Sequence, residues 1–106
     1  MRTARIAMPK TARKGDIVEI KTLIIHPMET GFRRDDVGRP VPRDIIGLFT
    51  VTYAGTEVFR MDLFPGVAAN PFAAFTTIAT ETGEFVFTWT DDKGVAHVEK
   101  MTLTVS

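Results

Sequence analysis

The chain has 106 residues, of which 44% are hydrophobic, and its 13 Lys and Arg residues balance its 13 Asp and Glu residues. A chain of this size fits a single domain, residues 1–106, with enough apolar side chains for an ordinary core. The balanced charge gives no positive field over the whole chain, which argues against nucleic acid as a partner. Cysteine is absent, so the chain cannot itself carry a group on sulfur.

No stretch approaches the roughly 20 apolar residues of a membrane span, so we expect no membrane as partner. Residues 1–15 carry the positive charges of a signal peptide but lack its apolar segment of about 7 to 15 residues. If the chain is exported, we expect it to travel with another protein that supplies the signal.

Period-two alternation predicts strands from the start of the chain. A short edge strand is expected at Ala4–Met8, followed by a turn at Lys14–Asp16 and a second strand at Asp16–Ile25. The residues of the second strand expected to face the core are Val18, Ile20, Thr22 and Ile24. Its opposite face ends in Leu23 and Ile25, which we expect to meet another surface.

A long connection, His26–Asp44, follows, about as long as connections without secondary structure become in compact domains. Its three prolines favour extended backbone in the residues before them, and its opposite charges alternate, so we expect an ordered loop. A stiff loop rich in arginine on a small domain is typical of a surface presented to a partner.

The second half of the chain continues the strand pattern. A hairpin is predicted from Ile45–Tyr53 and Glu57–Leu63, joined at Ala54–Gly55. Its inward residues are expected to be Phe49, Val51 and Tyr53. The next segment, Phe72–Thr80, is predicted as a strand, although its alanines leave a helix as the competing interpretation.

The last predicted hairpin joins Glu84–Thr90 to Val95–Val105 through a turn at Asp91–Gly94. Its first strand places Phe85, Phe87 and Trp89 on one face, whereas His97 and Glu99 interrupt the inward face of its second strand. About seven short strands with turns every 8–12 residues predict an all-β, immunoglobulin-like β-sandwich that lacks the usual cysteines.

Residues suited to catalysis are scarce. The two histidines, His26 and His97, have no companion at metal-ligand spacing, and the one serine is Ser106. Neither Asp35–Asp36 nor Asp91–Asp92 lies in a cleft-forming pattern, so solvated turns are expected. We therefore predict no catalytic site, no metal and no cofactor. Soft-metal binding by His26 and Met28 is the weaker alternative to packing of Met28 in a hydrophobic gap.

Two features leave alternatives open. The loop arginines either pair with nearby aspartates or act as bidentate clamps for a partner's carboxylates or an anion. The segment Pro71–Phe75 is either core or contact surface, with core favoured because its phenylalanines alternate with small residues.

A set of motifs in fixed order resembles the SoxZ family. It begins with HPMETG at His26–Gly31 and continues with G-x-P-x-P-R-x-I-I from Gly38 and F-T-V-T-Y from Phe49. Downstream come A-x-N-P-F from Ala68 and T-G-E-F-V-F-T-W-T-D-D from Thr82. The resemblance spans nearly the whole chain, and the order of the motifs makes it specific.

This resemblance implies an immunoglobulin-like sandwich that pairs with SoxY, whose mobile C-terminal arm carries sulfur intermediates on a cysteine during thiosulfate oxidation. It further implies a non-catalytic subunit without cofactor, transient docking of other Sox enzymes, and a periplasmic complex exported by the signal of SoxY. The chain departs from the family at Gly47, where Asn is usual, and at Lys93, where Asp is usual. Any partner hydrogen bond made by that Asn is lost.

We therefore expect the loop and the mixed strand faces to bind the partner. The candidate partner-binding residues are His26, Met28, Glu29, Arg33, Arg34, Arg43, Leu23, Ile25 and Phe75. The alternative function, from another class, is a free-standing anion-binding or adhesion sandwich whose arginine loop captures a small anionic molecule.

Overall fold

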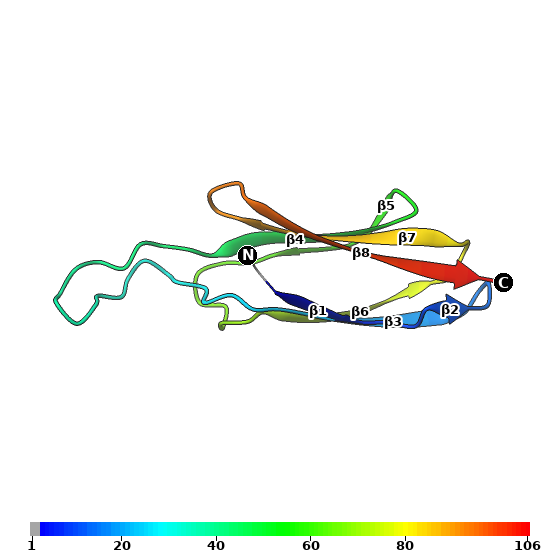
Figure 1. The fold of residues 1–106 in the computed structure, drawn as a ribbon, viewed down its shortest axis with the longest axis horizontal. Coiled ribbons are helices and arrows are strands. Elements are labelled where there is room, and N and C mark those ends of the chain that lie inside the picture. Colours follow the sequence, from blue (N-terminus) through cyan, green and yellow to red (C-terminus); the bar gives the residue numbers. More distant parts are fainter. Residues whose placement is uncertain (1–2) are drawn as a thin grey trace.

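The computed structural model describes residues 3–106, so Met1 and Arg2, at the start of the predicted domain, lie outside the described residues. Within this range the chain forms eight strands and no helix, hence no helix that could cross a membrane (Figure 1). The strands are β1 (Ala4–Ala7), β2 (Thr11–Ala12), β3 (Ile17–Ile24), β4 (Ile46–Tyr53), β5 (Thr56–Asp62), β6 (Phe72–Ile78), β7 (Gly83–Asp91) and β8 (Ala96–Val105). The all-β prediction is confirmed.

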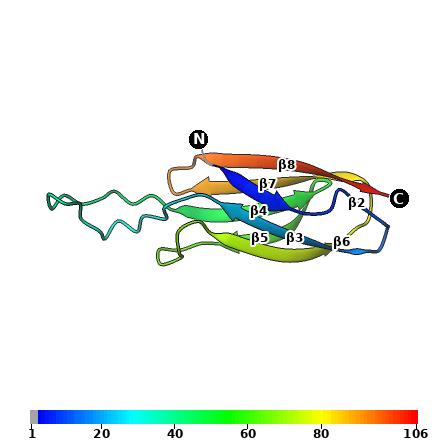
Figure 2. The same ribbon diagram turned by 60° about the horizontal axis from the view of Figure 1, so that its bottom comes forward.

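The strands form two sheets packed face to face as a sandwich (Figures 1 and 2). One sheet has the order β1-β3-β6 and the other has the order β2-β8-β7-β4-β5. The chain changes sheet between β1, which pairs with β3, and β2, which runs parallel to β8. The predicted immunoglobulin-like sandwich is confirmed, whereas β2 was not predicted because two paired residues carry no periodic signal.

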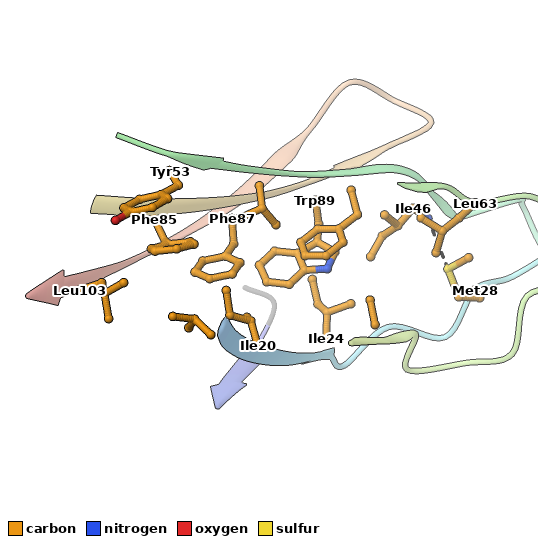
Figure 3. Packing of buried hydrophobic residues seen from close by; sticks show 14 of the residues in the cluster. Ile20, Ile24, Met28, Ile46, Tyr53, Leu63, Phe85, Phe87, Trp89 and Leu103 are labelled. Atoms are coloured by element: carbon orange, nitrogen blue, oxygen red, sulfur yellow. Dashed lines mark hydrogen bonds between the residues drawn. The ribbon is translucent and has the colours of Figure 1, made fainter. Parts of the chain in front are cut away.

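The core lies between the sheets and is built by the inward residues of the alternating strands (Figure 3). The predicted inward residues of β3, β4 and β7 are all buried. Aromatic rings run along the middle of this core, where Phe49 stacks on Trp89 at 4.7 Å between centroids and Tyr53 stacks on Phe85 at 4.3 Å. Such ring pairs add stability beyond the apolar area that they bury.

A tyrosine ties the two sheets together at the end of β4. The hydroxyl of Tyr53 donates to the carbonyl oxygen of Glu81 and accepts hydrogen bonds from the N–H groups of Thr80 and Glu81, at 3.2 and 3.0 Å. These bonds fix the connection between β6 and β7, and they satisfy the one polar atom of a buried side chain.

The competing helix at Phe72–Thr80 is wrong, because Phe72–Ile78 forms β6 and pairs with β3 over seven consecutive residue pairs. The helix propensity of the alanines is overridden by this pairing and by the burial of Ala73. In the preceding part of the chain, the first strand ends at Ala7 rather than Met8.

Candidate partner-binding site

The loop His26–Asp44, here called the arm, projects from one end of the sandwich (Figure 1). Its two legs run antiparallel and are joined by bridges between Glu29 and Asp44 and between Arg34 and Pro40. The molecule measures 59 Å along its longest axis but only 21 and 19 Å across. The predicted ordered loop is therefore a hydrogen-bonded extension of the fold.

His26 fixes the base of the arm. Its ring is 1% exposed, and its Nδ1 accepts a hydrogen bond of 2.9 Å from the N–H group of Met28. The neutral ring therefore carries its proton on Nε2, which lies 3.4 Å from Oδ1 of Asp44 on the other leg. The main chain of His26 also exchanges hydrogen bonds with Asn70, so three segments meet here.

Met28 packs under the arm rather than facing a ligand. Its side chain is buried beside Ile46 and Leu63 (Figure 3), and its sulfur accepts a hydrogen bond from the N–H group of Ile46 at 3.4 Å. This is the packing interpretation of Met28. Residues 3–106 contain no group of three or more His, Cys, Asp or Glu side chains arranged to hold a metal ion.

The arginines of the arm have local partners. The contacts are Arg33 with Glu29, Arg39 with Asp35 at 3.3 Å, Arg43 with Asp92 at 3.0 Å, and Arg34 with the carbonyl oxygen of Gly38 at 2.9 Å. The hydrogen bond and charge of Glu29 raise the pKa of Arg33 above its ordinary value. Surface ion pairs of this kind contribute about 0–1 kcal/mol each to the stability of the fold. Their main effect is to hold the shape of the arm, so of the two interpretations the local pairing is observed.

The tip of the arm is a capped turn with an apolar surface. Oδ1 of Asp35 accepts hydrogen bonds from the N–H groups of Val37 and Arg39, at 3.0 and 2.9 Å. Near this turn the side chains of Phe32 and Val37 are 86% and 70% exposed. Sequence reasoning missed both residues, although large apolar side chains in a charged loop are the signal that would have identified them.

The outer face of the β1-β3-β6 sheet carries a second apolar surface at the same end. Leu23 of β3 pairs with Phe72 of β6, and Ile25 follows in the chain; we call these three residues the apolar patch. Ile25 is 45% exposed and Phe72 is 60% exposed, whereas Leu23 is half-buried.

The two phenylalanines of Pro71–Phe75 divide between core and surface. They are three residues apart, and an odd separation places side chains on opposite faces of a strand. Phe75 therefore packs inward and stacks on Phe59 at 4.4 Å between centroids, whereas Phe72 points outward. This alternation was visible in the sequence, but Phe72 was not predicted as a partner contact.

The structure thus sorts the predicted partner-binding residues by position. The exposed ones are Ile25, Arg33, Arg34 and Arg43, whereas Leu23 and Glu29 are half-buried. By contrast, His26 and Met28 are buried within the monomer and Phe75 packs against its core. From these positions the three side chains would shape the surface from beneath, and contact of any of the nine residues with a partner stays a prediction.

A pocket of about 260 Å³ opens between the sheets beside the base of the arm. Its lining residues are Ile24, His26, Ile46, Trp89, Asp91, Val95, Ala96 and His97. At its edge, Nε2 of His97 hydrogen-bonds Oε1 of Glu99 at 2.9 Å, and the His97 ring lies 5.9 Å from the Trp89 ring. The two polar residues that interrupt the inward face of β8 therefore satisfy each other.

The family model of the sulphur oxidation protein SoxZ matches residues 5–102. The chain belongs to the SoxZ family. The resemblance carried by its ordered motifs is confirmed, and membership places the protein in the Sox system of sulfur oxidation. No curated protein matches the chain.

Solved structures share the sandwich of this SoxZ-family chain at low sequence identity. The sulfur carrier protein SoxY from Chlorobium limicola f thiosulfatophilum is 13% identical, with a TM-score of 0.69 over 97% of this chain and 78% of its own. A superoxide reductase (neelaredoxin) from Ignicoccus hospitalis is 15% identical, with a TM-score of 0.75 over 98% of this chain and 80% of its own. A CARDB domain from Pyrococcus furiosus is 14% identical, with a TM-score of 0.60 over 100% of this chain and 88% of its own. These likenesses show the fold alone.

Proposed function

We propose that this SoxZ-family chain is the non-catalytic subunit of the SoxYZ carrier complex. In this role it supports SoxY, which carries sulfur intermediates covalently on a C-terminal cysteine during thiosulfate oxidation. The chain has no cysteine of its own, so a carrier function requires a second polypeptide. The observation that carries the proposal is the apolar patch, which lies beside the base of an arm with an exposed apolar tip.

The patch and the arm together suit a heterodimer interface. Stable interfaces bury about 1,200–2,000 Å² in total around an apolar centre with a polar rim. Leu23, Ile25 and Phe72 would supply that centre, and Phe32, exposed on the arm at the same end of the sandwich, would add a further apolar contact. The locally paired arginines would then form a polar rim without unpaired buried charge.

The same ion pairs disfavour the alternative of a free-standing anion-binding module. A clamp for a small anion needs guanidinium groups whose N–H donors are available. Three of the four arm arginines already form ion pairs with carboxylates of the same chain. We further propose a periplasmic location, with export on the signal of SoxY, and transient docking of other Sox enzymes to the complex.

Co-expression with a SoxY chain, followed by size-exclusion chromatography, tests the proposal. We expect the two chains to elute together, and Phe72→Lys to weaken their affinity by about tenfold or more, because it places a charge in the apolar centre. Ile78→Lys is the matched control, since Ile78 lies exposed at the other end of β6. Independent elution of the wild-type chains at micromolar concentration would refute the pairing.

A further inference from the structure

Strand β8 borders the five-stranded sheet and has one side open over most of its length (Figure 2). On one side it pairs with β7 over eight consecutive residue pairs, from Thr90 with Ala96 to Gly83 with Leu103. On the other side, within residues 3–106, its only strand partner is β2, which reaches Thr104 and Val105. The stretch from Ala96 to Leu103 therefore presents an open edge.

The direction of the free backbone groups follows from the contact with β2. The N–H group of Thr104 donates to the carbonyl oxygen of Lys10 at 2.9 Å, so the backbone groups of Thr104 point away from β7. Backbone groups alternate sides every residue in an antiparallel strand. The residues whose N–H and C=O groups face the open side are therefore Ala96, Val98, Lys100 and Thr102.

This edge is regular, with neither a β-bulge nor a proline. The pairing of β8 with β7 shows no register shift, whereas the pairing of β4 with the opposite edge strand, β5, shifts between Val51 and Thr52. Strand β8 contains no proline, and Lys100 is its one lysine. Open edges of this regularity are templates for a further strand.

The pocket lies directly beside the open edge. Val95, Ala96 and His97 contribute to its wall at the start of β8, and Ile24 and Trp89 supply apolar surface below. At the pocket edge His97 hydrogen-bonds Glu99, so the polar side chain in the wall already has a partner. His26, at the base of the arm, also lines the pocket, so the pocket lies at the same end of the sandwich as the arm.

We propose that an extended segment of the carrier subunit adds to β8 as a further strand and inserts one apolar side chain into this pocket. A row of donors and acceptors repeating every two residues is matched by another backbone, and pockets beside the edge select alternate side chains. The identity of the partner rests on the proposed function, whereas the edge and the pocket are features of this chain alone.

Amide hydrogen exchange on the co-expressed complex tests the strand addition. We expect the N–H groups of Val98, Lys100 and Thr102 to exchange at least about tenfold more slowly in the complex than in the free chain. A complex that forms without this protection overturns the inference but leaves the proposed function standing. Failure to form any complex overturns both. Protection that grows with the concentration of the free chain indicates pairing of two copies and also overturns the inference.

Two variants test the same edge independently. Val98→Pro removes one donor on the open side without removing a bond to β7, and Val98→Thr is its control because it keeps the N–H group and the branched shape. Val95→Glu adds a charge at the pocket rim, at a residue that is 64% exposed, so folding is retained even if Val98→Pro fails to fold. We expect Val98→Pro and Val95→Glu to weaken the complex by about tenfold and Val98→Thr to leave it unchanged. Unchanged affinity of Val95→Glu and of folded Val98→Pro would overturn the strand addition.

Discussion

His26 shows how a single residue converts a long connection into a structural element. Its ring accepts a hydrogen bond from the N–H group of Met28 on one leg of the arm and faces the carboxylate of Asp44 on the other. Its main chain bonds Asn70, from the connection between β5 and β6. Burial strengthens such bonds, because a buried polar group left without its partner costs about 1–3 kcal/mol. The arm is therefore anchored by the core of the domain.

Two glycines of the chain have opposite tolerance to a side chain. Gly31 has a φ of +88°, and a Cβ there would lie 3.0 Å from the Cβ of Arg43 on the opposite leg. Gly47, the position where the chain departs from its family, has open space around it and no positive φ. The first position requires glycine, whereas the second does not.

We predict that Gly31→Ala lowers the free energy of unfolding by at least about 1 kcal/mol, because alanine is strained at positive φ and also meets Arg43. Gly47→Ala should raise the same quantity by about 0.5–1 kcal/mol, because alanine loses less backbone entropy in a strand. Urea denaturation of the two variants measures both changes. Equal stability of the two variants would show that the legs of the arm do not approach as described.

At the scale of elements, the arm is stiff because its legs are joined by bridges, its turn is capped by Asp35, and its arginines are paired. A preorganised element loses little conformational entropy when it binds, so more of its contact energy appears as affinity. The exposed ring of Phe32 is then the side chain best placed to act as an anchor, since aromatic residues dominate binding energies at interfaces.

We predict that Phe32→Ser weakens binding to SoxY by about tenfold or more while leaving the thermal midpoint nearly unchanged, because the ring is exposed in the monomer. Isothermal titration of the purified chains gives the affinity. Ile17→Ser is the control, since Ile17 is similarly exposed but lies at the other end of β3 from the arm. Equal affinities of the two variants would exclude Phe32 from the interface.

At the scale of the molecule, both sheets contribute side chains to one continuous core. Trp89 is buried in the middle of it, with Phe49 and Phe87 as ring neighbours, and it is the chain's one tryptophan. A domain with a single shared core unfolds as a unit, because neither sheet can bury its apolar face alone.

We predict a single cooperative transition in urea, with the same midpoint whether unfolding is followed by Trp89 fluorescence or by far-UV circular dichroism. The dominance of pairing between distant strands should make refolding slow for a small domain, in the range of milliseconds to seconds. Stopped-flow fluorescence measures the rate. Two separate midpoints would contradict the single domain predicted for residues 1–106.

Most of the fold was predictable because alternation is a local property of the chain. The inward residues of β3, β4 and β7 were predicted correctly from period-two patterns alone. The short β2 was not predicted because two residues carry no periodic signal and their pairing depends on β8, some ninety residues further along the chain. For the site, Leu23 and Ile25 were predicted as surface residues, whereas the exposure of Phe32 and Phe72 was not.

The sequence by itself determined the class of fold, the family, the absence of cysteine and the place of the long arm. Tertiary structure alone decided which arginines find local partners, that His26 and Met28 lie beneath the arm, and that one side of β8 remains open. The physical reason is the distance along the chain over which each interaction acts. Alternation and turn propensity act over a few neighbouring residues, whereas burial, ion pairing and free edges depend on which distant segments the folded chain brings together.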